Sequence, residues 1–239
     1  MILVSNILIV SDIHGHIKQF EELLTYWNQE DTLVILGDLI DRGPDSLKVI
    51  EKVIELKQIY EDKVIFVKGN HEEMLLNFLN NPIEKQEHYY KNGGQETIQS
   101  LLVHLPNDIA DQTYTEQANE IKQHYQAQLA FLESAPTFQI IGNVLCTHAG
   151  FNSEFATLEE TTERDYIWIR KHYETINKTP YINVFGHTPV TYIHESNDVW
   201  VSEDKRYIAI DGGCYMSGQL NAVLLNQQGE VLYVYKVQY

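Results

Sequence analysis

Short runs of branched apolar residues, each ending in a polar residue or a glycine, recur along the chain. The first three lie at residues 7–10, 33–36 and 64–67. Four apolar residues in succession are typical of a short strand that is buried on both faces. Between these runs, apolar residues recur at helical spacing over residues 17–27 and from about 44 to 57. Strand, polar loop and helix in repetition predict a parallel sheet built from βαβ units.

The sequence changes character from residue 73 to about residue 134. Helical patterns dominate there, notably over residues 74–79 and 116–132, and Asn92-Gly93-Gly94 interrupts them. We predict a mostly helical insertion that covers one face of the candidate site. No internal repeat and no linker rich in proline, glycine or serine is present, so we expect one domain over residues 1–239 with this segment inserted.

The strand pattern resumes after the helical segment. Three further strands and a closing β-hairpin are predicted, at residues 144–146, 182–185, 207–210, 220–225 and 231–237. Taken alone, this pattern predicts a single, mainly parallel sheet.

The loop after the second predicted strand organises the candidate chemistry. Gly37 ends the strand, Asp38 follows at once, and Asp41, Arg42 and Gly43 come three to five residues later. In open α/β sheets, ligands bind at the carboxyl ends of strands. A single carboxylate at such a position commonly caps a helix or closes a turn. The same arrangement at several strand ends is what indicates an enzyme.

Polar side chains of this kind follow five of the predicted strands. The side chains are those of Asp12, His14, Asp38, Asp41, Arg42, Asn70, His71, His148 and His187. Oxygen and imidazole ligands without thiolate suit Zn, Mn or Fe. Two acids, one amide and three histidines provide enough ligands for two ions, which in such sites lie about 3.5–4 Å apart and need a bridging carboxylate. We assign the bridge to Asp38, on the central of the three early loops, and expect Asp12 and His14 to face the same side of an extended backbone.

Such a centre is suited to phosphoester hydrolysis. Two ions lower the pKa of a shared water and polarise the phosphoryl oxygens. Arg42 is able to form a bidentate contact with those oxygens. His71 is placed to protonate the departing alkoxide, with Asp41 accepting from its other ring nitrogen and fixing the tautomer.

Charge and composition narrow the class of substrate and the compartment. The formal net charge of −17 argues against a nucleic-acid polymer as partner. With only four arginines, positive charge for a phosphate must come mainly from metal ions. No apolar run approaches the ~18 residues of a membrane span, and the N-terminal apolar run lacks a basic flank, so we read it as the first strand and expect a cytoplasmic protein. Cys146 and Cys214 are predicted to be buried free thiols.

Three of these segments together resemble the signature motifs of the PPP-type metallophosphoesterases. They are Asp12-Ile-His14, Gly37-Asp38-Leu-Ile-Asp41-Arg42-Gly43 and Gly69-Asn70-His71-Glu72. With His148-Ala-Gly and Gly186-His187-Thr, the resemblance extends over about residues 7–215. Within it, Asp41-Arg42-Gly43 is the most discriminating piece, and the chain is most similar to short bacterial and phage members.

The resemblance implies a role for each motif residue. Asp12 and His14 would bind the first metal and Asp38 would bridge. Asn70, His148 and His187 would bind the second, and His71 with Asp41 would form the acid pair. The substrate phosphate would contact Arg42, Arg170 and Asn70. The family fold is α/β, a four-layer α/β/β/α sandwich, and the family mechanism is in-line attack by a metal-bridging hydroxide.

Two substrate classes fit this core. We favour a Ser/Thr protein phosphatase, because the few arginines count against a tetraphosphate, and keep symmetrical hydrolysis of diadenosine tetraphosphate as the alternative. A non-catalytic metal-dependent binding module is a third hypothesis, disfavoured because no ligand is missing. Arg170 is preferred over Arg164 as a phosphate contact from its Trp168-Ile-Arg170 context, and His16 and Asp211 are expected to be structural.

Overall fold

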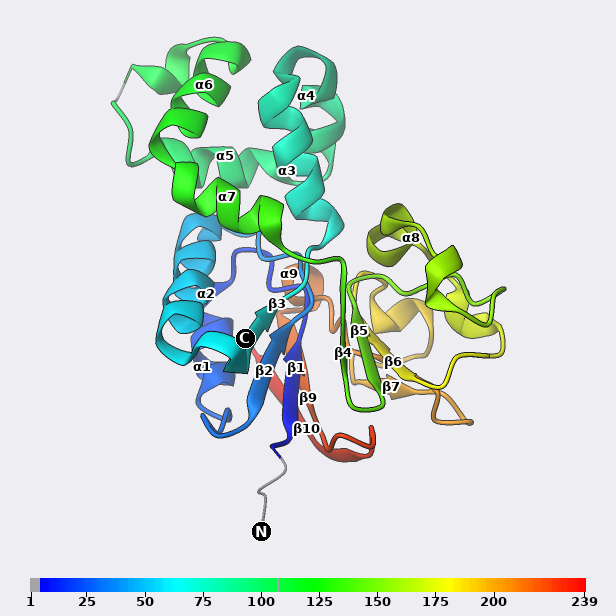
Figure 1. Cartoon of the computed structure of the whole chain (residues 1–239). Helices are drawn as coiled ribbons and strands as arrows, with labels where there is room; N and C mark the ends of the chain where they lie inside the picture. The colour runs from blue at the N-terminus through cyan, green and yellow to red at the C-terminus, as the bar shows by residue number, and fades with distance from the viewer. Residues whose placement is uncertain (1–4, 107) are drawn as a thin grey trace.

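The computed structural model describes residues 5–106 and 108–239 and shows two five-stranded sheets packed face to face (Figure 1). The first sheet has the order β10 (Val231–Gln238), β9 (Gln219–Leu225), β1 (Ile7–Val10), β2 (Thr32–Ile35) and β3 (Val64–Phe66). The second has the order β4 (Phe138–Ile141), β5 (Val144–Thr147), β6 (Ile182–Phe185), β8 (Tyr207–Ala209) and β7 (Trp200–Val201).

Alternate residues of each central strand pack into different layers. On β1, Ile7 and Ile9 belong to the core between the two sheets. Leu8 and Val10 face the other way, into the core shared with α1 (Ile17–Leu24) and α2 (Ser46–Tyr60). The outer face of the second sheet packs against α8 (Glu163–Trp168), which contributes Tyr166 and Ile167. Helices therefore cover both outer faces, and the predicted four-layer α/β/β/α sandwich is confirmed.

The single parallel sheet predicted from the strand pattern alone is wrong. Strands β1, β2 and β3 are parallel, and so are β5, β6 and β8, but the two triplets lie in different sheets. A strand buried on both faces is apolar whether a helix or a second sheet covers it, so the pattern cannot tell which. The predicted β9–β10 hairpin is present. The edge strands β4 and β7 were not predicted.

In the described residues between β3 and β4 lie five α-helices, at the top of Figure 1. They are α3 (Asn70–Asn80), α4 (Pro82–Lys91), α5 (Gly94–Leu102), α6 (Tyr114–His124) and α7 (Gln126–Ser134). Of the Asn92-Gly93-Gly94 interruption predicted from sequence, Asn92 and Gly93 separate α4 from α5, and Gly94 begins α5. The continuous helix expected over residues 116–132 is instead two helices, because the backbone leaves the helical region at Tyr125 (φ −112°, ψ 33°).

Short helical turns complete the chain between the strands. They are η1 (Glu61–Lys63), η2 (Ile109–Asp111), η3 (Leu158–Glu160), η4 (His172–Glu174), η5 (Val190–Tyr192) and the one-turn α9 (Cys214–Ser217). Both cysteines are free and buried, as predicted. In residues 5–106 and 108–239 we find no helix with the length and apolar character needed to cross a membrane.

The backbone turns sharply where the strands deliver their polar residues. Six residues of the predicted site have positive φ: Asp12, His14, Asp38, Asp41, Arg42 and His187. This conformation is uncommon outside glycine and persists where the surrounding structure enforces it. Asp12 (φ 55°) and His14 (φ 48°) therefore do not continue an extended strand, as the sequence analysis assumed. The two side chains nevertheless lie close to each other, because the backbone turns through the left-handed conformation at both residues.

Glu72 ties together the loops that follow β2 and β3. Its buried carboxylate accepts hydrogen bonds from the backbone N–H groups of Asp38 (3.0 Å), Leu39 (2.8 Å) and Gly69 (2.8 Å). Burial, and next the Asp38 carboxylate, raise the pKa of Glu72 to about 7. The same two loops touch at Gly37 (φ +84°), where a Cβ would collide with the backbone of Gly69.

Gly37→Ala is expected to destabilise the fold more than Gly213→Ala. Both positions have positive φ, so each alanine costs about 1–2 kcal/mol in backbone strain. A Cβ at Gly213 comes closest to the end of the Met216 side chain, at 3.3 Å, whereas at Gly37 it collides with backbone. Overpacking should therefore add about 1–3 kcal/mol at Gly37. Urea denaturation of the metal-stripped proteins measures the difference, and equal losses would show that the two loops do not touch at this point.

Candidate metal centre

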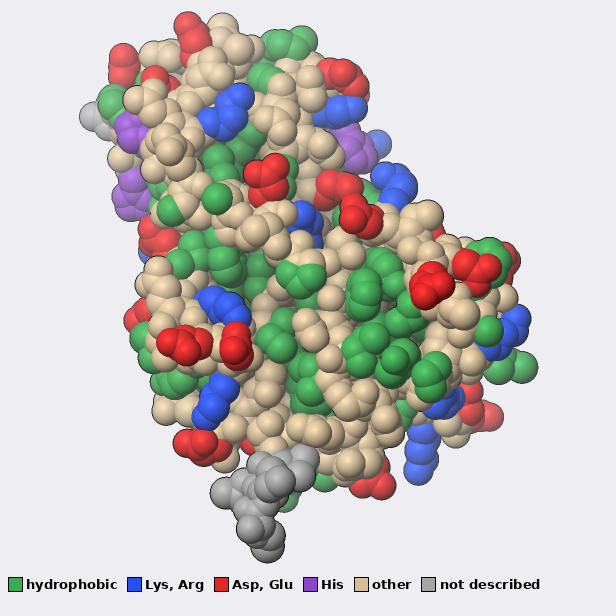
Figure 2. All heavy atoms as spheres, in the orientation of Figure 1, with side chains coloured by type: hydrophobic (Ala, Val, Ile, Leu, Met, Phe, Trp, Pro, Cys, Tyr) green, Lys and Arg blue, Asp and Glu red, His purple; other side chains and the backbone are tan. Residues whose placement is uncertain are grey.

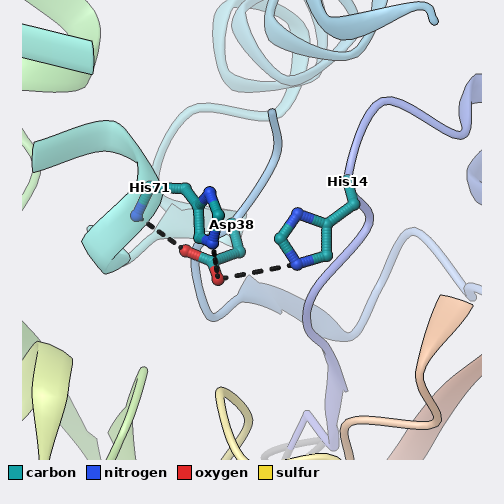
Figure 3. A group of neighbouring side chains, drawn as sticks. All are labelled: His14, Asp38 and His71. Carbon is teal, nitrogen blue, oxygen red and sulfur yellow. Dashed lines mark hydrogen bonds and ion pairs between the residues drawn. The ribbon is translucent and has the colours of Figure 1, made fainter. Parts of the chain in front are cut away.

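Three imidazoles from separate elements converge on one carboxylate oxygen. The Nε2 atoms of His148, His14 and His71 lie 3.4, 3.7 and 3.8 Å from Oδ2 of Asp38. Figure 3 shows His14 and His71 directed at Asp38, with the His71 backbone N–H also bonded to the second carboxylate oxygen, Oδ1, at 3.1 Å. All four side chains are buried. Asp38, in the loop after β2, is thus the geometric centre of the cluster.

Backbone carbonyls hold two of these imidazoles with Nε2 facing the cluster. Nδ1 of His14 donates to the carbonyl oxygen of Ile40 at 2.8 Å, and Nδ1 of His148 donates to that of Leu36 at 2.6 Å. In the neutral form of either ring, the lone pair is then on Nε2, which faces Asp38. Contacts of this type orient histidine ligands in metal sites and fix their tautomers.

Asp12, Asn70 and His187 complete the predicted set of ligands. An Asp12 oxygen lies 4.0 Å from His14 Nε2, and Asn70 Oδ1 lies 2.9 Å from His148 Nε2. The His187 backbone N–H donates to Asp12 at 3.0 Å, and its ring lies 5.1 Å from that of His148. His187 Nε2 is buried and finds no hydrogen-bond partner among the described residues. A buried, unpaired imidazole nitrogen beside carboxylate and amide oxygens fits a divalent cation.

The pKa values reflect a crowded, buried set of donors. Burial, then His71 and Arg42, hold the pKa of His14 well below its usual value, so this ring is neutral and able to ligate. Burial also lowers the pKa of His187. Burial raises the pKa of Asp12 to about 6. For Asp38, burial acts to raise the pKa, but the facing His148 and His71 hold it well below the usual range.

Arg42 spans the cluster from the same loop as Asp38. Its Nη1 lies 2.9 Å from His14 Nε2 and its Nη2 lies 3.0 Å from His71 Nε2. The guanidinium carbon also lies 4.0 Å from the centre of the Tyr215 ring, a cation–π contact. The half-buried guanidinium therefore lies beside the candidate ligands, where a bound phosphate could accept from its two nitrogens.

Arg170 and Arg164 take different positions near His187. Arg170 Nη1 donates to the backbone carbonyl of His187 at 3.3 Å and to Thr188 at 3.2 Å. Arg164 instead lies over the Trp168 ring, 5.3 Å from its centre. Trp168 in turn meets the His187 ring edge to face at 6.0 Å. Of the two arginines, Arg170 is the one bonded to a loop of the site, and its contact with a substrate phosphate stays a prediction.

The predicted pair of His71 and Asp41 is in contact, with His71 Nδ1 2.6 Å from Asp41 Oδ2. Sequence reasoning missed the groups behind Asp41: the hydroxyls of Tyr89 and Thr97 both donate to its Oδ1, at 2.8 and 2.6 Å. These residues follow Asp41 by 48 and 56 positions. The only local signal for them was their position on either side of the glycines that interrupt the helical segment.

Two residues that the sequence analysis set aside have structural contacts. His16 directs Nδ1 to the backbone carbonyls of His14 (2.7 Å) and Ile13 (3.2 Å). Asp211 accepts from the Gly213 backbone N–H at 2.9 Å, which closes the turn after β8. Burial, then Asp12, raise the pKa of Asp211 well above its usual value. Both residues border the cluster and are bonded to backbone.

Comparison with known proteins places this geometry in a family. The asymmetrical bis(5'-nucleosyl)-tetraphosphatase PrpE of Anoxybacillus flavithermus is 28% identical over 244 residues, covering 90% of this chain and 88% of that protein. The symmetrical bis(5'-nucleosyl)-tetraphosphatase of Buchnera aphidicola is 46% identical over 66 residues, covering 26% of this chain and 23% of that protein.

Solved structures share the fold at low sequence identity. A putative diadenosine tetraphosphatase superposes with a TM-score of 0.67 at 20% identity, covering 99% of this chain and 95% of that one. A protein serine/threonine phosphatase from Saccharomyces cerevisiae superposes with a TM-score of 0.58 at 14% identity, covering 99% of this chain and 80% of that one. The sequence profile of the calcineurin-like phosphoesterases matches residues 5–218. The chain therefore belongs to the calcineurin-like phosphoesterase family, and its His/Asp clusters are able to bind the divalent metal ions that this family implies.

Proposed function

We propose that this protein hydrolyses dinucleoside tetraphosphates with the help of two divalent cations. The relatives matched over about nine-tenths of this chain carry the name asymmetrical bis(5'-nucleosyl)-tetraphosphatase. Those carrying the symmetrical name match about a quarter to a third of it. This supports a dinucleotide as substrate, the alternative in the sequence analysis, and favours the asymmetrical cut, which leaves ATP and AMP from diadenosine tetraphosphate.

The single structural observation that carries the proposal is the position of Tyr215. Its ring lies against Arg42 and 5.3 Å from the His14 ring, and 37% of the residue remains exposed. A phosphate held by Arg42 would place the group attached to it near this aromatic ring. A nucleobase gains about 1–3 kcal/mol by stacking on such a ring. A phosphoserine side chain has no ring to stack.

Residues of both sheets would hold the cations. Asp12, His14 and Asp38 would bind one ion, and Asn70, His148 and His187 would bind the other, with Asp38 shared. Mn, Fe and Zn all suit this mixed oxygen and nitrogen set. When bound, the ions would supply positive charge to the phosphoryl oxygens and lower the pKa of a nearby water.

The remaining groups act on the substrate. Arg42 and Arg170 would bind phosphate oxygens, with Asn70 as a further contact. His71 as an imidazolium would donate its Nε2 proton to the leaving group, while Asp41 accepts from Nδ1 and fixes the ring. A leaving nucleotide has a terminal phosphate with a second pKa near ~6, so it needs this proton less than an alkoxide does.

The Ser/Thr protein phosphatase favoured in the sequence analysis stays an unsupported prediction. The acidic character of the chain opposes an acidic phosphopeptide and a tetraphosphate alike, so net charge does not separate the two substrates. On the face shown in Figure 2, acidic and basic side chains are interspersed and no continuous basic area is visible. This agrees with a small nucleotide rather than a nucleic-acid polymer. We keep the cytoplasm as the proposed compartment.

The substrate class is tested by direct competition. The metal-stripped protein is loaded with Mn and given equal concentrations of diadenosine tetraphosphate and a phosphothreonine peptide. We expect faster cleavage of the dinucleotide, with ATP and AMP as products by ion-exchange chromatography. Faster phosphate release from the peptide would overturn the proposed substrate class, and ADP as the only product would overturn the asymmetrical cut.

Tyr215→Leu should weaken dinucleotide binding, whereas Tyr215→Phe should not. Leucine keeps apolar bulk but cannot stack, and phenylalanine keeps the ring. We expect KM for diadenosine tetraphosphate to rise about 5–150-fold in Tyr215→Leu, which corresponds to the stacking energy of about 1–3 kcal/mol. KM for methyl phosphate serves as the control, because that substrate has no base. An equal rise for both substrates would show that Tyr215 acts on Arg42 and not on a nucleobase.

His71→Asn should slow the hydrolysis of poor leaving groups most. A general acid contributes about 10²–10⁴-fold where the leaving group needs a proton. We therefore expect a loss of that order in kcat on phenyl phosphate, and a much smaller loss on p-nitrophenyl phosphate and on the dinucleotide. Steady-state kinetics on the three substrates provide the comparison. Equal losses on all three would argue that His71 is not the proton donor.

A further inference from the structure

The helical segment between β3 and β4 reaches into the candidate acid pair through two hydroxyl groups. Tyr89 lies on α4 and Thr97 on α5, and both hydroxyls donate to Oδ1 of Asp41, at 2.8 and 2.6 Å. Oδ2 of the same carboxylate is 2.6 Å from Nδ1 of His71. One oxygen of Asp41 is thus held by the helical segment, and the other is directed at His71.

The backbone of Asp41 is fixed by the same groups. Its N–H donates to Thr97 Oγ1 at 2.8 Å and to Ser46 Oγ at 3.2 Å, and these two hydroxyls lie 2.9 Å apart. The next N–H, of Arg42, donates to the carbonyl of Gly93 at 2.9 Å. Asp41 and Arg42 have φ of 71° and 69°, a conformation that needs such external support.

The network is closed to solvent. Asp41 and Thr97 are fully buried, and Tyr89 and His71 are each 1% exposed. The Tyr89 ring stacks on Phe78 at 5.2 Å, and a Cβ at Gly94 would collide with that ring. Because packing fixes the ring, its hydroxyl has little freedom to leave Asp41. Buried networks of this kind orient their members when every donor and acceptor is paired.

From this arrangement we infer that Tyr89 and Thr97 are positioning residues for His71. They orient Asp41 so that Oδ2 accepts from Nδ1 and the opposite nitrogen, Nε2, faces the leaving group. The inference rests on the proposed role of His71 as proton donor. It assigns to the helical segment an indirect part in the reaction, through Asp41 and His71.

The test compares Tyr89→Phe with Tyr125→Phe. Tyr125 is a matched control, because its buried hydroxyl donates to the Leu101 carbonyl at 2.7 Å within the same helical segment and has no contact with Asp41. The Mn-loaded enzymes are assayed on phenyl phosphate and on p-nitrophenyl phosphate. We expect Tyr89→Phe to lower kcat/KM about tenfold on phenyl phosphate and at most about twofold on p-nitrophenyl phosphate. The ratio of kcat/KM on p-nitrophenyl phosphate to kcat/KM on phenyl phosphate should therefore rise in Tyr89→Phe and stay at the wild-type value in Tyr125→Phe.

Two further variants separate positioning from general damage. Thr97→Ser keeps the hydroxyl and should keep the wild-type ratio of activity on p-nitrophenyl phosphate to activity on phenyl phosphate. Thr97→Val removes the hydroxyl and should raise this ratio, as Tyr89→Phe does. In a His71→Asn background, Tyr89→Phe should leave the ratio unchanged, because the group that it positions is gone. Equal losses on both substrates in Tyr89→Phe, or a further change in ratio without His71, would overturn the inference.

A readout independent of turnover distinguishes failure of this inference from failure of the proposed function. The Nδ1 proton of His71, held between nitrogen and carboxylate, should give a downfield proton resonance that is lost in His71→Asn. We expect this resonance to shift in Tyr89→Phe and to stay in place in Tyr125→Phe. An unchanged resonance in Tyr89→Phe would overturn the positioning role even if the dinucleotide is cleaved as proposed.

Discussion

The structure depends on bringing several electron-rich groups together around one oxygen of Asp38. Three imidazole nitrogens lie within 3.4–3.8 Å of it, and the Asp12 carboxylate lies beside His14. Buried polar groups without partners are costly, and His187 Nε2 has none among the described residues. Cations would offset that cost, so metal binding would stabilise the fold at this point. Without them, the apolar layers on either side of both sheets hold the cluster together.

The centre lies where the two sheets meet. His148 follows β5 of the second sheet, yet its Nδ1 donates to the carbonyl of Leu36, at the end of β2 in the first. The backbone N–H of His187, after β6, donates to Asp12, after β1. Each sheet supplies only part of the donor cluster, and contacts between their loops bring the parts together. Packing of the two sheets is therefore a condition for the chemistry as well as for the core.

The sequence predicted where the donors lie but not what surrounds them. Apolar runs that stop at Asp38 or His148 identify strand ends, because a buried strand needs apolar residues on both faces. They carry no information on whether a helix or a sheet covers each face, which is why the strand pattern alone predicted one sheet. The resemblance to a family corrected this. Tyr89 and Tyr215 escaped notice because long-range packing sets their contacts with the site, and no local pattern marks such contacts.

The acid pair also bears on the choice of substrate. A buried Asp41 with both oxygens occupied is a strong device for orienting His71, and its value is greatest when the leaving group is a poor one. A nucleotide departs without full protonation, since its terminal phosphate has a second pKa near ~6. For such a group the proposed role of His71 would chiefly be that of a hydrogen-bond donor to developing negative charge, a role that depends on geometry more than on proton affinity. Orientation by the helical segment therefore remains useful for an anhydride substrate, and the pair does not by itself favour a phosphoprotein.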